Sequence, residues 1–137
     1  MKKIILVLSI VFTSIIVNAQ QAPKAVKENF AKKFPTAKSV KWEKENDKEY
    51  EASFTVDGTK HSANFTNDGT WVETESEIKI ANLPQAVTAA ISSKYAGYKV
   101  VDASKIETAT TVKYEADIKK GKIKKEVLFA EDGTFIK

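Results

Sequence analysis

The chain carries two short segments in which apolar residues recur at every fourth position. This spacing predicts two amphipathic helices, each with one apolar stripe that must pack against another element. A proline precedes each stripe, at Pro23 and Pro84, where the first turn of a helix tolerates it. The two stripes consist of Val26, Phe30 and Phe34 in the first segment and of Val87, Ile91 and Tyr95 in the second.

After each predicted helix the period of the pattern changes to two, which is typical of half-buried β-strands. Asp57-Gly58 is a two-residue hairpin signal, and a turn there places Phe54 opposite His61 on the apolar face. A turn at Gly121-Lys122 pairs the corresponding apolar residues later in the chain. We therefore expect antiparallel strands with one apolar face, which the helix stripe covers.

The flanking turns decide on which face the two tryptophans lie. A two-residue turn at Asp68-Gly69 places Trp71 on the face opposite Phe65. If the preceding turn is Asn46-Asp47, Trp42 joins Trp71 on that open face. The acidic run 43–51 is interleaved with lysines, which favours a solvated hairpin over a catalytic carboxylate pair.

The same order of helix and strands occurs twice. Positions 22–40 match 83–101, and after a three-residue insertion positions 50–71 match 114–135. Each copy has about 55 residues, too few to bury a generous core alone. The predicted fold is α+β, with two tandem repeats of a helix and a four-stranded antiparallel meander. The two sheets are expected to join, with both helices on one face and the other face open to solvent.

The first residues predict a secretory signal peptide rather than a membrane anchor. A short basic start precedes an apolar run from Ile4 to Val17, which is shorter than the roughly 20 residues that span a bilayer. Small residues then favour cleavage after Ala19. The expected divisions are a signal peptide at 1–19, a first repeat at 20–80 and a second at 81–137. The location is then periplasmic or secreted, without membrane insertion after cleavage.

The amino-acid composition argues against several classes of function. The chain has no Cys and one His, which excludes a disulfide scaffold, Cys-based chemistry and a histidine cluster for metal. Without the signal peptide, 20 Lys and 18 acidic residues leave a net charge of +2, and no Arg is present, which argues against nucleic acid. The aspartates are explained by turns and lack the spacing of a calcium loop. We expect no metal and no cofactor.

His61 is the one residue that titrates near neutral pH. The hairpin pairing places it on the helix-covered face, and its neighbour Ser62 points to the opposite face. No Ser-His-Asp set, phosphate loop or cofactor signature is visible. The sequence therefore predicts a structural histidine and a protein that is not an enzyme.

Lysines concentrate in the predicted hairpin 119–125 and make the second repeat net +3, against −1 for the first. This charge difference could steer an acidic partner or bring two copies together head to tail. The alternative is that the lysines protect an edge hairpin from aggregation.

The motif order resembles a known family. The resemblance is carried by the predicted signal peptide, by segments 31–35, 40–42, 50–54 and 65–71, and by a second copy over 86–135. These features resemble the PepSY-like periplasmic proteins, which have a fold like the β-lactamase inhibitory protein. Ala103 and Phe135 depart from the pattern, since they stand where the first copy has Trp42 and Trp71. The resemblance implies a tandem helix-plus-sheet fold, and related folds bind or inhibit secreted enzymes through a sheet face.

Aromatic residues on an open sheet indicate a binding surface. The alternative is that the aromatics of one repeat pack against the other repeat or a loop. We expect an exported, non-enzymatic binding module that inhibits or modulates a periplasmic or envelope protein; the alternative is a carrier of a small apolar or glycan ligand. The predicted binding surface consists of Trp42, Trp71, Phe135, Leu128, Lys60 and Asn64.

Overall fold

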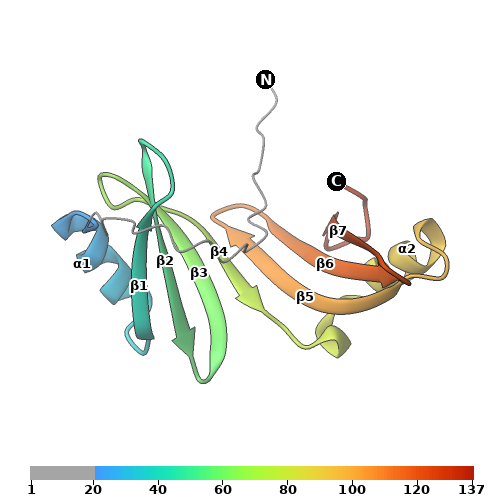
Figure 1. Ribbon diagram of the computed structural model, residues 1–137. Helices are drawn as coiled ribbons and strands as arrows, with labels where there is room; N and C mark the ends of the chain where they lie inside the picture. The colour runs from blue at the N-terminus through green and yellow to red at the C-terminus, as the bar shows by residue number, and fades with distance from the viewer. Residues whose placement is uncertain (1–20) are drawn as a thin grey trace.

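The computed structural model describes residues 21–137, in which two helices pack against one seven-stranded antiparallel sheet (Figure 1). The strands follow chain order across the sheet from β1 to β7. The predicted signal peptide lies outside the described residues. The elements are α1 Lys24–Lys33, β1 Lys38–Lys44, β2 Glu49–Val56, β3 Thr59–Thr66, β4 Trp71–Glu77, the 3₁₀ helix η1 Ile80–Asn82, α2 Gln85–Lys94, β5 Lys99–Thr108, β6 Val112–Lys120 and β7 Ile123–Ala130.

Both helices begin directly after a proline, as the sequence predicts. The carbonyl oxygen of Pro23 accepts a hydrogen bond from the backbone N–H of Lys27 at 3.1 Å, and Pro84 repeats this contact with Thr88 at 3.0 Å. The first two residues of each apolar stripe are buried, and the last, Phe34 or Tyr95, is half-buried. The two predicted helices are therefore confirmed.

The two hairpins with clear turn signals also form as predicted. Val56 pairs with Thr59 around the Asp57-Gly58 turn, and Lys120 pairs with Ile123 around the Gly121-Lys122 turn. Strands β4 and β5 then pair with each other over five residue pairs, which joins the two halves into one sheet.

The expectation of four full strands in the second repeat is wrong. After β7 the chain forms only an isolated bridge, in which Phe129 pairs with Phe135. Further backbone hydrogen bonds extend it, among them Leu128 N–H to Lys137 O and Ile136 N–H to Leu128 O. This stretch is too short to form a ladder, so the sheet has seven strands where the sequence predicts up to eight.

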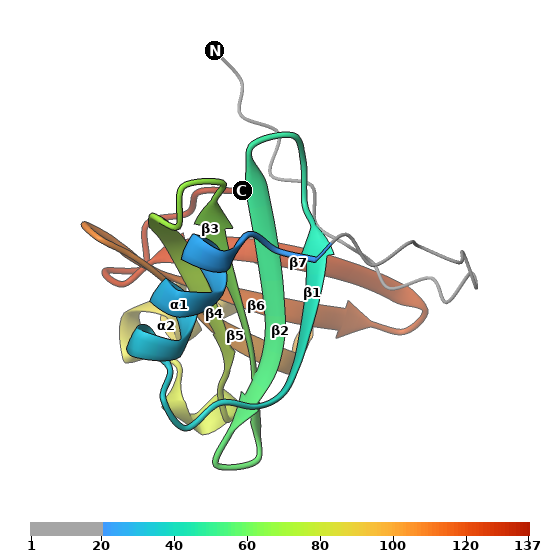
Figure 2. The ribbon, with the colours of Figure 1, turned by 90° about the vertical axis from the view of Figure 1, so that its left-hand side faces the viewer.

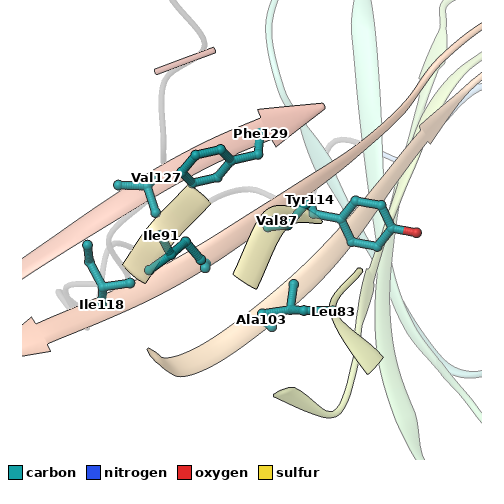
Figure 3. Close-up of a cluster of buried hydrophobic side chains, with 9 residues drawn as sticks. Leu83, Val87, Ile91, Ala103, Tyr114, Ile118, Val127 and Phe129 are labelled. Atoms are coloured by element: carbon teal, nitrogen blue, oxygen red, sulfur yellow. The ribbon is translucent and has the colours of Figure 1, made fainter. Parts of the chain in front are cut away.

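Both helices lie on the same face of the sheet (Figure 2). The first core lies under α1 and the second under α2; Figure 3 shows the second. The first core contains Ala22, Val26, Phe30, Ala52, Phe54, Ala63 and Phe65. The second contains Leu83, Val87, Ile91, Ala103, Tyr114, Ala116, Ile118, Val127 and Phe129.

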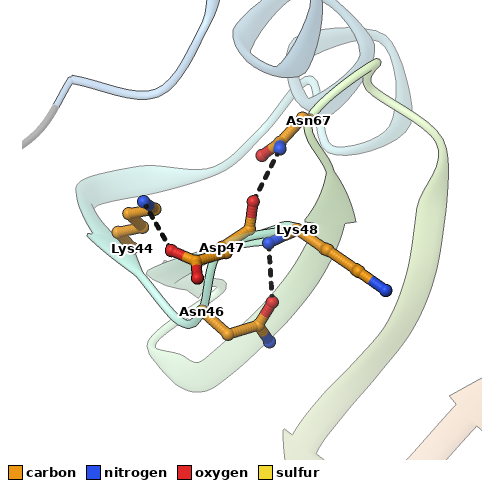
Figure 4. Close-up of polar contacts among 5 residues, drawn as sticks. All are labelled: Lys44, Asn46, Asp47, Lys48 and Asn67. Carbon is orange, nitrogen blue, oxygen red and sulfur yellow. Dashed lines mark hydrogen bonds and ion pairs between the residues drawn. The ribbon is translucent and has the colours of Figure 1, made fainter.

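The loop between β1 and β2 is longer than the predicted two-residue turn (Figure 4). Asn46 Oδ1 accepts a hydrogen bond from the backbone N–H of Lys48 at 2.8 Å, which closes a local turn. Asn67, from the turn after β3, donates to the carbonyl oxygen of Asp47 at 2.9 Å and ties the two loops together. Lys44 also pairs with Asp47 at 3.2 Å. These contacts decide the register of β1, and with it the face of Trp42.

Candidate functional site

The predicted position of Trp42 on the open face is wrong. With the longer loop, Lys44 pairs with Tyr50 and Trp42 pairs with Ala52. A shift of one residue in register moves every side chain of a strand to the other face. Trp42 therefore faces α1, where its ring meets Phe30 edge-on at a centroid distance of 5.2 Å.

The predicted position of Trp71 is wrong for a related reason. The pairing of β3 with β4 contains a bulge at Val72, so that Asn64 pairs with Glu73 but Phe65 pairs with Trp71. The bulge adds one residue at this point of the strand. Trp71 therefore packs against the first core, and its indole N–H donates to Thr74 Oγ1 at 2.9 Å.

Phe135 also lies on the helix side of the sheet, contrary to the prediction. Its ring lies 5.5 Å from Phe129 and 6.3 Å from Tyr95, measured between centroids. The ammonium of Lys94 lies 4.2 Å from the ring centroid, and the residue remains 40% exposed. In place of the predicted exposed aromatic surface, each of these aromatics packs within its own half, rather than against the other repeat or a loop as the alternative expected.

The other three predicted surface residues lie on the open face. Lys60 pairs with Thr55, and Asn64 pairs with Glu51, all on the side away from α1. Leu128 pairs with Glu115 on that side but is only 5% exposed. A role in binding for Lys60, Asn64 and Leu128 stays a prediction.

The open face is mainly acidic and polar along its centre, and no helix of residues 21–137 covers it. Glu51 and Glu73 face the same Asn64 from either side. Glu75 lies next along β4, beside Ile106 of β5. We call the central part of this surface the acidic face and define it by five of its glutamates: Glu51 on β2, Glu73 and Glu75 on β4, Glu115 on β6 and Glu126 on β7.

Burial and crowding raise the pKa of carboxyl groups on this surface. Desolvation, followed by the charges of Glu75 and Glu126, raises the pKa of Glu115 to about 8. Desolvation, followed by neighbouring carboxylates, also raises the pKa of Glu51 and that of Glu73.

Lysines compensate this charge only in part. Lys113 acts on Glu73 and counters the rise of its pKa, and Lys137 lies 3.8 Å from Glu126. Desolvation still raises the pKa of Glu126. The acidic face therefore combines partly dehydrated carboxylates with a local excess of negative charge.

Sequence reasoning missed this surface, although a signal was present. Glu73, Glu75 and Glu115 stand at alternate positions of their strands, out of phase with the buried residues. Their convergence depends on the pairing of β4 with β5, which no local turn reveals.

Within residues 21–137, no group of three or more His, Asp or Glu side chains is arranged so that it could hold a metal ion. The carboxylates are spread along the sheet rather than directed at one point.

His61 lies on the helix-covered face beside Phe54, with a ring-centroid distance of 5.4 Å. Its partner is Ser76 of β4, whose Oγ lies 2.8 Å from Nδ1, rather than its sequence neighbour Ser62. Burial lowers the pKa of His61. A carboxylate that supported a catalytic relay would raise that pKa, so this pair lacks the charge that the relay requires.

The lysine-rich segment forms the tip of the β6–β7 hairpin, and its side chains are exposed. Strand β7 is an edge strand of the ladder. Lysines on an exposed edge discourage pairing with another chain, which agrees with the protective interpretation.

Comparison with known proteins relates this chain to a family. A family model described as "Putative beta-lactamase-inhibitor-like, PepSY-like" matches the chain twice, over residues 11–57 and 48–137, which fits a tandem repeat. A comparison with curated proteins gave no match. No helix in the described residues is long and apolar enough to cross a membrane.

Several solved structures share the architecture. A BLIP-like protein from Bacteroides fragilis is 28% identical, with a TM-score of 0.73 and coverage of 85% of this chain and 84% of that one. A DUF2874 family protein from Bacteroides uniformis is 23% identical, with a TM-score of 0.78 and coverage of 85% and 88%. A protein from Bacteroides eggerthii, titled as one of the "putative periplasmic proteins", is 22% identical, with a TM-score of 0.78 and coverage of 85% and 87%.

The matched family and the BLIP-like neighbour are inhibitor-like in description and are not an enzyme family. The family match extends from residue 11 to the last residue of the chain. The chain therefore belongs to the PepSY-like, β-lactamase-inhibitor-like family.

Proposed function

We propose that this protein is an exported, non-enzymatic binding module that inhibits or modulates a periplasmic or envelope protein through its acidic face. The observation that carries the proposal is the open side of the seven-stranded sheet with its partly buried glutamates. The BLIP-like fold supports a binding role.

The chemistry of the face indicates the chemistry of the partner. Removing carboxylates from water and placing them near one another costs free energy, which an opposing positive surface recovers. Strongly perturbed carboxylates are found preferentially at functional sites for this reason. The partner surface should therefore carry lysine or arginine side chains opposite Glu73 and Glu115, with Asn64 and Lys60 at the margin of the contact.

The test is a crosslinking pull-down from the native host envelope with the chain from Gln20 as bait. A Glu73→Gln/Glu115→Gln variant removes two carboxyl groups from the acidic face. A Glu28→Gln/Glu131→Gln variant removes the same number of carboxyl groups from exposed positions on α1 and in the turn after β7. We expect one protein to be captured by the wild-type and control baits and lost with the first variant.

The captured protein is then purified and its affinity is measured at increasing ionic strength. Affinity should fall as salt screens the charges across the interface. Equal capture by all three baits, or an affinity that does not respond to salt, would contradict a role for the acidic face.

A further inference from the structure

The helix-covered face has a gap in the middle. Helix α1 covers β2 and β3, and α2 covers β5 to β7. Between these two cores, β4 and β5 place polar side chains on the same face, since Ser76 pairs with Lys105 and Thr74 with Glu107. A cleft of about 290 Å³ opens there, lined by Lys33, Phe34, His61, Trp71, Thr74, Ser76 and Glu107.

The cleft has one uncompensated positive charge. Glu107 is neutralised by Lys105, whose ammonium lies 2.8 Å from its carboxylate. Lys33 forms no ion pair within residues 21–137, and its ammonium lies 3.7 Å from the ring centroid of Trp71. An ammonium held over an aromatic ring keeps its charge, and the N–H donors that point away from the ring remain free for an anion.

The polar side chains that line the cleft also have hydrogen-bond donors without an acceptor in the protein. Thr74 Oγ1 accepts the indole N–H of Trp71, so its own proton is free. The neutral His61–Ser76 pair has two protons and uses one in its mutual hydrogen bond. The other proton remains on Nε2 of His61 or on Oγ of Ser76, whichever tautomer forms.

The apolar wall of the cleft restricts the class of ligand that could bind. Trp71 packs against the first core and carries Lys33 over its ring, so the stacking surface that a sugar would use is occupied. Phe34 is half-buried beside it and supplies an apolar edge. The volume lies at the lower limit of ligand pockets, which suits a molecule smaller than a typical drug.

We propose that this cleft binds a small organic acid, with its single carboxylate on Lys33 and a compact apolar ring against Phe34 and the edge of the Trp71 ring, whose faces are occupied. One lysine without arginine matches a monoanion rather than a phosphate ester. The site lies on the face opposite the acidic face and does not depend on the function proposed for that face.

Phenylacetate is a suitable probe, and phenylacetamide is its uncharged control. Binding is followed by tryptophan fluorescence in a Trp42→Phe background, in which Trp71 is the one emitter, and by the NMR signal of His61, the single histidine. We expect a saturable fluorescence change with phenylacetate, a shift of the His61 signal, and affinity at least about tenfold weaker for the amide.

Lys33→Met should weaken phenylacetate binding by about tenfold or more, because it removes the charge that holds the carboxylate. Lys32→Met removes the same charge from an exposed neighbour that does not line the cleft and should leave binding unchanged. Binding that is absent up to about 10 mM, the weak limit for a ligand of this size, overturns the proposal. So does equal binding of the amide, equal binding by Lys33→Met, or a fluorescence change without a shift of His61.

Discussion

Gly69 lies against the backbone of α1, so that a Cβ added to it would stand 2.8 Å from the carbonyl oxygen of Ala25. Gly133 has the same relationship to Ala86 of α2, at 2.6 Å. In each half, the turn after the third strand therefore sits directly on the first part of the helix. Asn29 strengthens the first of these contacts by donating to the carbonyl oxygen of Gly69 at 2.8 Å.

Replacing Gly69 with Ala should destabilise the protein more than replacing Gly58. Both glycines have positive φ, +91° and +79°, and an alanine in this region costs about 1–2 kcal/mol. Gly58 has no atom within 4 Å of the added Cβ, whereas at Gly69 the methyl group meets the helix backbone. Overpacking of this kind adds about 1–3 kcal/mol. Urea unfolding of the two variants measures the difference in the free energy of unfolding. Equal losses for both variants would show that the backbone at Ala25 moves away from the added methyl group at no cost.

Replacing Phe129 with Ala should lower the free energy of unfolding by about 3–5 kcal/mol, because its fully buried ring leaves a cavity in the second core. Ile123→Ala is the control, since Ile123 is 56% exposed and its loss should change stability by no more than about 0.5 kcal/mol.

The Phe129→Ala variant also tests whether the two halves unfold together. Both tryptophans lie in the first half, and β4 pairs with β5 across the middle of the sheet. Tryptophan fluorescence should therefore melt at the same lowered temperature as the circular dichroism of the whole chain. Fluorescence that keeps the wild-type midpoint would show that the halves unfold independently.

Stability should fall as pH rises from about 4.5 to about 8, through the contribution of Glu115. Its pKa is raised from 4.5 to about 8 in the folded protein, so within this window the folded state binds a proton that the unfolded state has released. Glu115→Gln should therefore raise the melting temperature at pH 8 by several degrees and change it little near pH 4.5. Thermal melts of both proteins across this range provide the measurement.

The comparison with Glu115→Gln is needed because His61 affects the pH dependence of stability in the opposite direction to Glu115. Burial lowers its pKa below 6.5, so it contributes stability that increases as pH rises towards 6.5. The difference between the two proteins cancels this contribution. A difference that does not change with pH would mean that Glu115 titrates at its ordinary value.

The imidazole of His61 should titrate with a midpoint below 6.5, because burial disfavours its charged form. The ring signals are unambiguous in an NMR titration, since the chain has one histidine. A midpoint above 6.5 would require an anionic neighbour that acts on the ring, and would contradict the neutral His61–Ser76 pair.

Sequence patterns predicted the β2–β3 and β6–β7 hairpins correctly and misplaced the strands beside the first of them. Asp57-Gly58 and Gly121-Lys122 close two-residue turns, for which the turn residues themselves determine the register. Asp68-Gly69 has the same appearance, but a bulge at Val72 follows it in the pairing of β3 with β4. Gly69 also docks on α1, a contact between distant segments that the local sequence does not reveal.

The position of the candidate site depends still more than the fold does on contacts between residues that are distant in the sequence. The sequence located Asn64 and Lys60 on the open face because their hairpin is local. Trp42 and Trp71 turned to the other face because each register moved by one residue. The acidic face and the His61–Ser76 pair needed the β3–β4 and β4–β5 pairings.

The sequence alone determined two helices and two hairpins, because helix stripes and tight turns depend on residues a few positions apart. The tertiary structure decided where the two halves join, how far the last strand extends, and which face each tryptophan occupies. A strand exposes one side or the other according to a shift of a single residue, and long-range packing selects that shift. The acidic face and the cleft beside Lys33 therefore exist only in the assembled sheet.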